Sequence, residues 1–264
     1  MPMVGSLLCL RSKISQVPYS PPQANTLIID KNGYIGDKHV AKDLTYYAIL
    51  DNRADFSQSE LGQVTIIVPE IGSVEIGGRT YKTTKIGNQT WLAENLDYKF
   101  EGIDINPTNT NPITPAAWYY NRDEATYGWN GRKDGLLYNS YAVQLMDSNR
   151  NIAFHGWHIA QKSDWQTLQA TLTSQFGSQN VGIVIKSGDY WTSYSGTDSY
   201  QLCIQPSGFI HNNIFYSIGD TASFWTPNNS SYSYNTYLDK SNYNIYYDTN
   251  ALTNGLSVRL VKDT

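Results

Sequence analysis

Two segments with helical spacing interrupt a chain that otherwise consists of short strand-like runs. In GLLYNSYAVQLM (135–146), Leu137, Tyr141 and Leu145 recur at positions i, i+4 and i+8. This spacing places the three side chains on one face of an α-helix. We therefore predict a first helix over this segment.

A second helix is predicted to begin at Ser163. Ser163 can cap the amino end of the helix, and Gln166 completes a capping box three residues later. Four apolar residues form a single stripe along the segment: Trp165, Leu168, Leu172 and Phe176. Such a stripe is typical of an amphipathic helix that packs against a core.

The segments around these helices indicate antiparallel strands. Residues 79–98 alternate like a hairpin, with the turn at Gly87-Asn88. After Phe176, short apolar runs are separated by long polar loops, and the last loop precedes the strand-like run GLSVRLVKD (255–263). Two helices among short strands predict an α+β domain over residues 73–264.

Residues 1–72 differ from the rest and are predicted to form a small β-rich module. TLIID (26–30) and QVTIIVPEI (63–71) have the composition of strands, and Asn32-Gly33 is a tight-turn signal. The region holds few aromatic side chains suited to a binding site. We expect it to serve as an attachment or oligomerisation module, which makes other proteins of an assembly its partners.

Composition excludes several classes of function. The formal net charge of −4 and the absence of a basic stripe give no reason to expect nucleic-acid binding. The apolar run 4–10 is too short to cross a bilayer, and Arg11 and Lys13 follow it rather than precede it, so neither membrane insertion nor a signal peptide is expected. Cys9 and Cys203 are the only cysteines, which suits folding in a reducing cytoplasm.

The segment 226–250 has the composition of a recognition surface. Six of its 25 residues are Tyr, six are Asn and four are Ser. Tyr provides a large, stiff contact surface, and Asn and Ser provide adaptable hydrogen bonds, as in antibody paratopes. A solvated polar loop would explain the Asn and Ser residues but not the Tyr residues. The predicted ligand-binding residues are Trp225, Asn228, Asn229, Tyr232, Tyr234, Asn235, Tyr237, Asn242, Tyr243, Asn244, Tyr246 and Tyr247.

Four ordered blocks resemble the Fibrobacter succinogenes major paralogous domain family. They are YKTTKIGNQTWLAENLDY (81–98), YGWNGRKDGLLYNSYAV (127–143), GWHIAQKSDWQTL (156–168) and the closing run 255–263. The resemblance implies a C-type lectin-like fold similar to formylglycine-generating enzymes, with Trp91, Trp157 and Trp165 in the core. It covers none of residues 1–70.

The sequence departs from this family at its cysteines. Ala153 and Leu260 stand where many members carry Cys, and no counterpart of the catalytic cysteines of formylglycine-generating enzymes is found. Cys203 lies in an apolar run and is expected to fill core. In related phage and bacterial proteins the segment before the last strand is a variable region rewritten by a diversity-generating retroelement. The resemblance implies the same for 226–250, with an ordinary Asn/Tyr-rich loop as the alternative.

Other patterns that could carry chemistry have simpler explanations. His155 and His158 lack a third ligand and suit a packed loop better than a metal site. Asp30, Asn32 and Gly33 suit a hairpin turn better than a calcium loop. No nucleophile elbow, P-loop or dinucleotide fingerprint is present, so we expect no enzymatic activity, no metal and no cofactor.

Together these observations predict a bacteriophage virion protein. The attachment module would join it to other virion proteins, and the Tyr/Asn-rich face would bind a host-surface glycan or protein. The expected form is a head fibre or tail-associated adhesin, arranged as a homotrimer. The alternatives are a structural virion decoration protein without ligand binding, a bacterial cell-surface protein of the same family and, less favoured, a residual enzyme related to formylglycine synthesis.

Overall fold

The computed structural model describes residues 69–212, 214–227 and 232–264 in full, and four short strands before them. The chain divides into two compact units, residues 1–69 and 70–264. In the first unit, β1 (Tyr19–Ser20) pairs with β2 (Gln23–Ala24), and β3 (Thr26–Ile28) pairs with β4 (Gln63–Thr65). The predicted strands at 26–30 and 63–71 thus exist in part. The Asn32-Gly33 turn and Cys9 lie outside the described residues. The expected role of the module stays a prediction.

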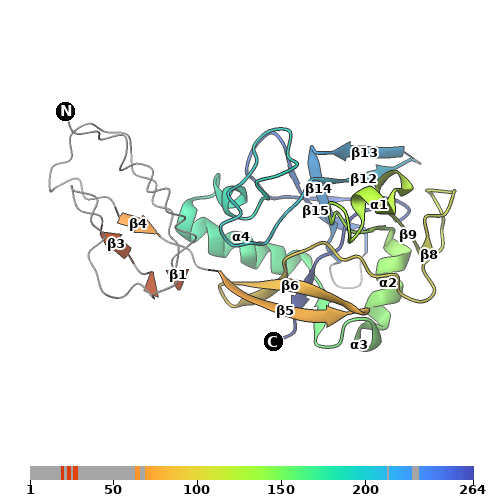
Figure 1. Cartoon of the computed structure of the whole chain (residues 1–264), viewed down its shortest axis with the longest axis horizontal. Coiled ribbons are helices and arrows are strands. Elements are labelled where there is room, and N and C mark those ends of the chain that lie inside the picture. Colours follow the sequence, from red (N-terminus) through yellow and green to blue (C-terminus); the bar gives the residue numbers. More distant parts are fainter. Residues whose placement is uncertain are drawn as a thin grey trace. The chain divides into compact units, whose positions relative to one another are not determined.

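The second unit is built from three sheets (Figure 1). The first has the order β11 (Trp157–Ile159), β17 (Leu260–Lys262), β7 (Gln89–Leu92), β6 (Arg79–Ile86) and β5 (Glu70–Ile76). The second has the order β10 (Leu137–Tyr138), β9 (Ala116–Trp118) and β8 (Asp104–Ile105). The third has the order β13 (Ile214–Ile218), β12 (Ser207–His211), β14 (Thr221–Trp225), β15 (Tyr234–Asp239) and β16 (Tyr246–Thr249).

Helical elements are few and, with one exception, short. They are η3 (Tyr120–Arg122), α1 (Glu124–Tyr127), α2 (Ser140–Ser148), α3 (Arg150–Ala153), α4 (Lys162–Phe176) and η4 (Val181–Val184). Among the residues described, none of these helices is long and apolar enough to cross a bilayer.

The prediction of an α+β, C-type lectin-like domain is wrong. Thirteen strands in three sheets dominate the described part of the second unit, and no C-type lectin-like layout of helices and strands is evident. The physical reason is that much of the segment taken for polar loop forms ladders. Tyr and Thr are good strand formers, and between residues 234 and 249 they pair as β15 and β16 instead of lying free.

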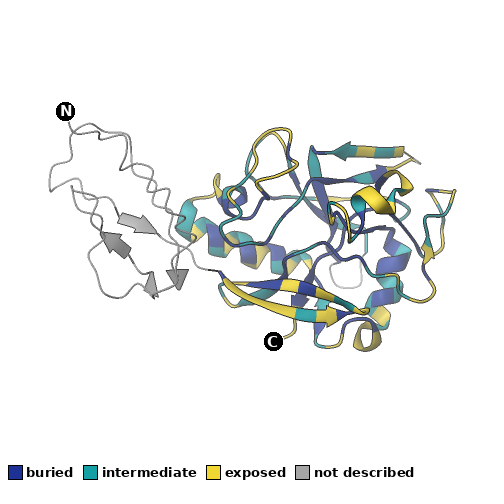
Figure 2. Cartoon of the chain, viewed as in Figure 1, coloured by how far each residue is buried: buried dark blue, intermediate teal, exposed yellow. Residues whose placement is uncertain are grey.

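The predicted hairpin at 79–98 is confirmed. Ile86 pairs with Gln89 across the two-residue turn at Gly87-Asn88, and β5 adds a further antiparallel strand. The outer strand β5 is largely exposed, whereas the strands behind it are mostly buried (Figure 2). Trp91, Trp157 and Trp165 are buried, as expected.

The longest helix, α4, confirms its predicted stripe but not its predicted cap. Trp165, Leu168 and Leu172 are completely buried, and each contributes about 1.5–3 kcal/mol on leaving water. The helix begins before Ser163, because Gln161 is the N-cap and forms a capping box with Asp164. The cap was missed because a Gln at this position is a weak signal in a sequence.

The other predicted helix is shorter than expected. Leu137 and Tyr138 pair with β9 instead of starting a helix, and Asn139 caps α2 by accepting a hydrogen bond from the Ala142 amide. The spacing of apolar residues extended the predicted helix across this cap. Strand pairing and a polar cap therefore override periodicity here.

Candidate functional site

The Tyr/Asn-rich segment forms an antiparallel pair of strands at one end of the third sheet. Trp225 in β14 lies opposite Asn235 in β15, and Asn235 lies opposite Asp248 in β16. Because side chains alternate across a strand, this register divides the segment between two faces of the sheet. Asn228 and Asn229 lie outside the described residues.

One face of the pair packs toward α4 and is termed the helix face. Tyr234 and Tyr247 lie near the Lys162 ammonium group, at 5.1 and 5.7 Å from the ring centres. The Tyr247 hydroxyl donates to Gln169 Oε1 at 2.8 Å, and burial raises the pKa of Tyr247 to about 12. These two predicted ligand contacts serve the protein's own packing.

Several other predicted residues also make internal contacts. Trp225 is buried and donates through Nε1 to the Tyr138 carbonyl at 2.6 Å. The Tyr232 hydroxyl donates to Asp147 at 2.8 Å, and its ring packs against the core. Trp225 therefore anchors the strand internally, and the half-buried Tyr232 bonds within the protein, while their role in ligand binding stays a prediction.

The turn between β15 and β16 is organised around a buried lysine. The Lys186 ammonium group donates to the carbonyls of Asp239 and Asn242 and lies 5.4 Å from the centre of the Tyr243 ring. The Asn242 side chain accepts from the Asn244 amide at 2.8 Å. The predicted contacts Asn242, Tyr243 and Asn244 thus hold the turn together.

The opposite face carries a row of side chains across all five strands, and we term it the open face. Tyr216 lies opposite Phe209, Ser223 lies opposite Tyr237, and Tyr237 lies opposite Tyr246. The parallel pairing of Gly208 with Ala222 places Phe209 beside Ser223. Gly208 is required here, because a Cβ atom would lie 2.4 Å from the Tyr216 carbonyl oxygen.

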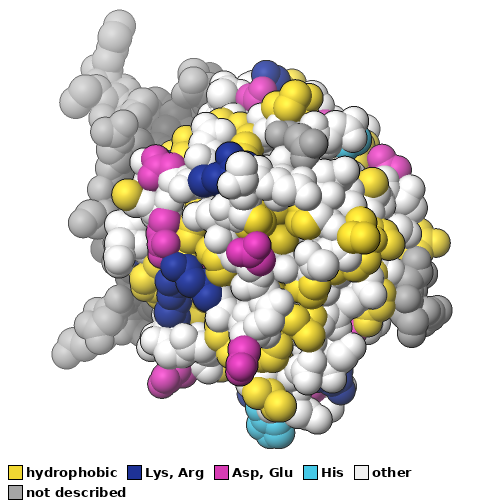
Figure 3. Space-filling model, turned by 90° about the vertical axis from the view of Figure 1, so that its right-hand side faces the viewer, with side chains coloured by type: hydrophobic (Ala, Val, Ile, Leu, Met, Phe, Trp, Pro, Cys, Tyr) yellow, Lys and Arg dark blue, Asp and Glu magenta, His cyan; other side chains and the backbone are white. Residues whose placement is uncertain are grey.

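Two aromatic pairs therefore flank one small serine. The rings of Phe209 and Tyr216 stack with centres 5.8 Å apart at 28°, and those of Tyr237 and Tyr246 stack at 5.1 Å and 21°. All four rings are partly or fully exposed. Figure 3 looks at the side of the molecule on which β12 and β13 lie in Figure 1, and hydrophobic side chains form a band across it.

A polar groove of about 300 Å³ runs over this row. It is lined by Phe209, Ser217, Thr221, Ser223, Asn235, Tyr237, Asp239, Asp248 and Asn250. Asn235 is only 3% exposed, and its Oδ1 atom has no hydrogen-bond partner among the described residues. A buried acceptor without a partner costs about 1–3 kcal/mol, and a donor placed in the groove can relieve that cost.

The chemistry of the groove favours a ligand rich in hydroxyl groups. Burial, together with the Asp248 and Asp239 carboxylates, raises the pKa of Tyr237, so its hydroxyl stays protonated and can donate. Carboxylate and amide oxygens accept from hydroxyl groups, whereas exposed aromatic rings pack against C–H surfaces. The lining therefore combines two aromatic rings with many polar side chains, which suits a polar ligand better than an apolar one.

Sequence reasoning identified only part of this site. Asn235 and Tyr237 line the groove and Tyr246 stacks beside it, all three within the predicted set. Phe209 and Tyr216 were missed, although they lie among the apolar runs that follow Phe176. β12 pairs in parallel with β14 across the intervening strand β13, and residue spacing gives no signal of that pairing.

The histidines considered above as metal ligands have other surroundings in the structure. Within the fully described ranges, no group of three or more His, Cys, Asp and Glu side chains is placed to hold an ion. His158 instead bridges two carboxylates, with Nε2 at 3.0 Å from Asp164 and Nδ1 at 2.8 Å from Asp263. Asp30, considered above for a calcium loop, lies outside the described residues.

Comparison with known proteins identifies one family. The model of the Fibrobacter succinogenes major domain matches residues 84–262, which is more than half of the chain, so the chain belongs to this family. The match begins within β6 and runs to β17, so it leaves out β5 and the first unit. No curated protein and no solved structure matches the chain.

Proposed function

We propose that this member of the Fibrobacter succinogenes major domain family is a non-enzymatic binding protein that holds a host-surface glycan on the open face of β12–β16. The observation that carries the proposal is the row of two stacked aromatic pairs on either side of Ser223, beneath a polar groove. A sugar ring would lie over Ser223 with its C–H surfaces against the aromatic rings. Its hydroxyl groups would bond to Asn235, Asp239 and Asp248.

The biological setting that we propose is a bacteriophage virion, as a head fibre or tail-associated adhesin. Residues 1–69 would attach the protein to other virion proteins, and three copies would display three grooves. Two cysteines in 264 residues suit a protein made in the host cytoplasm and carried out on a particle. Several weak sites on one particle bind far more strongly than one, because later contacts form at high effective concentration.

Diversification of the segment 226–250 is part of this proposal, and the fold restricts where it can act. Tyr237, Tyr246 and Asp248 lie on the open face and can change without loss of core packing. Tyr247 and Tyr232 bond to Gln169 and Asp147 and are expected to stay constant. Sequencing the 3′ end of the gene in sibling phages would reveal this pattern.

The test is an array of bacterial-surface glycans probed with the wild-type protein and with a Tyr216→Ala/Tyr237→Ala variant. The wild type is expected to bind a defined subset of the glycans. The variant is expected to bind none of that subset while keeping its melting temperature. Tyr216 is exposed and Tyr237 is half-buried outside the core clusters, so the double variant is expected to fold with a small loss of stability, about 1 kcal/mol. Equal binding by both proteins would show that the open face is not the site.

A second experiment separates the adhesin from a structural decoration protein. Mass spectrometry of purified phage particles would establish whether the protein is a virion component. Particles carrying the same double variant are expected to assemble normally but to adsorb poorly to host cells. Unchanged adsorption by particles that contain the variant would favour decoration, and absence from particles would favour a cell-surface protein.

A further inference from the structure

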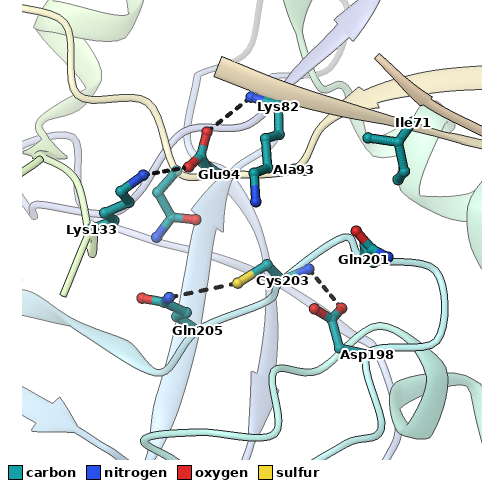
Figure 4. Close-up of a pocket in the computed structure, with 10 residues that line it drawn as sticks. Ile71, Lys82, Ala93, Glu94, Lys133, Asp198, Gln201, Cys203 and Gln205 are labelled. Carbon is teal, nitrogen blue, oxygen red and sulfur yellow. Dashed lines mark hydrogen bonds and ion pairs between the residues drawn. The ribbon is translucent and has the colours of Figure 1, made fainter. Parts of the chain in front are cut away.

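A second cavity lies away from the open face, between the first sheet and the segment that precedes β12. Its volume is about 350 Å³, and most of its lining is polar or charged. It is lined by Ile71, Lys82, Ala93, Glu94, Asn95, Lys133, Asp198, Gln201, Cys203 and Gln205 (Figure 4). Cys203 therefore lines a cavity, which corrects its expected place in an apolar core strand.

The charged side chains that line this cavity are two lysines and two carboxylates, and only one lysine is held in an ion pair. Glu94 pairs with Lys133 at 3.1 Å, and no ion pair joins the Lys82 ammonium group to another described residue. Figure 4 shows the Lys82 side chain extending from β6 into the cavity, toward Cys203. The Lys82 ammonium group therefore faces the cavity without an ion-pair partner among the described residues.

A third cation lies beneath the floor. Arg259 is 1% exposed and donates only to neutral oxygens, among them Asn95 Oδ1 at 2.8 Å and the Cys203 carbonyl at 2.6 Å. Burial lowers the pKa of Arg259 to about 10, so the guanidinium group is still charged at neutral pH. A buried charge without a salt-bridge partner is unusual and raises the local potential.

The remaining acid of the cavity titrates near neutrality. Asp198 accepts a hydrogen bond from the Cys203 amide at 2.8 Å, and burial raises the pKa of Asp198 to about 7. The charged and titratable groups around it are Arg259, Cys203, Lys82, Lys133 and Glu94. Three cations thus face two carboxylates, so the net charge is +1 while Asp198 is ionised and +2 once it is protonated.

We propose that this cavity binds a small organic monoanion through its carboxylate, with Lys82 as the principal contact and Arg259 as supporting charge. The site volume suits a single sugar acid or a metabolite of similar size. While Asp198 is ionised, the excess charge is +1, which a monoanion balances and which the phosphate dianion present at pH 8 exceeds. The site is separate from the glycan groove and does not depend on it.

Isothermal titration calorimetry of the full chain with glucuronate tests this inference, with glucose and inorganic phosphate as comparison ligands. Glucuronate is expected to bind and glucose is not, and phosphate is expected to bind more weakly at pH 8. Affinity for glucuronate should rise between pH 8 and pH 6, because protonation of Asp198 removes a negative charge next to the anion. The rise should be roughly tenfold or less, which corresponds to a single nearby charge.

Matched variants make the result decisive. Lys82→Met should weaken glucuronate binding roughly tenfold or more, as expected for loss of a charge-assisted contact. Lys85→Met on the same strand, whose native side chain pairs with Glu70, should leave it unchanged. Asp198→Asn should bind at pH 8 as the wild type does at pH 6. Absence of glucuronate binding at pH 6, equal loss in both lysine variants, or tighter binding of phosphate would each overturn the proposal.

Discussion

The two faces of the β14–β16 ladder carry the same residue types but make different contacts. On the helix face, Phe224 packs on Trp165 of α4 at 5.1 Å, and Tyr247 bonds to Gln169. On the open face, Tyr237 and Tyr246 stack on each other beside a groove that no described segment fills. The number of Tyr residues does not distinguish the two faces.

Strand register makes the distinction. Tyr246 and Tyr247 are neighbours in sequence, yet the pleat directs their side chains to opposite faces. A shift of one residue in β16 would exchange them, placing a residue adapted to the core in the groove. An enrichment of recognition-type residues therefore overstates the size of a binding surface when the segment forms strands.

The largest effect is expected on the helix face. Phe224→Ala should lower the free energy of unfolding by about 3–5 kcal/mol, because the ring is completely buried against Trp165. Urea denaturation followed by tryptophan fluorescence would measure it. A loss below about 1 kcal/mol would show that the helix face is not a packed core.

The next effect concerns binding and separates the faces directly. Tyr237→Ala should weaken glycan binding by about 2 kcal/mol, roughly 30-fold, because it removes one ring of a stacked pair at the groove. Tyr247→Phe is the matched control and should bind normally. Surface plasmon resonance on an immobilised glycan ligand would compare them, and equal losses would end the distinction between the faces.

A smaller effect is expected on stability from the same control. Tyr247→Phe removes the hydroxyl that donates to Gln169, which should cost about 1 kcal/mol. Thermal unfolding by circular dichroism would detect a drop of a few degrees. An unchanged melting temperature would mean that Tyr247 contributes no net hydrogen bond to the attachment of α4.

The smallest effect is a pH dependence of the free energy of unfolding, due to His158 and its bond to Asp164 of α4. Burial alone would lower the pKa of His158, but hydrogen bonds to Asp164 and Asp263 outweigh it and raise the pKa above its usual value. The stabilisation is therefore fully present below the unfolded pKa of about 6.5 and is lost as pH rises through the folded pKa. His158→Gln should destabilise the protein more at pH 6 than at pH 9, as measured by urea denaturation. Glycan binding by this variant should match that of the wild type. A change in binding would show that α4 and the groove are coupled.

Local features were predictable from the sequence, and long-range pairing was not. The turn at Gly87-Asn88 and the stripe of α4 follow from residue type and spacing within a few residues. The parallel pairing of β12 with β14 skips the strand between them, and the position of Arg259 beneath Cys203 joins distant segments, so residue spacing signals neither. For the same reason, Asn235 and Tyr237 were identified by composition, whereas Phe209 and Tyr216 required the register of the sheet.

The most direct test is a crystal structure of the protein with the glycan that binds it best. Ligand density is predicted over Ser223, between the Phe209–Tyr216 and Tyr237–Tyr246 pairs, with a sugar hydroxyl within hydrogen-bond distance of Asn235 Oδ1. Density on the helix face near Lys162, or anywhere else with the groove empty, would contradict the account.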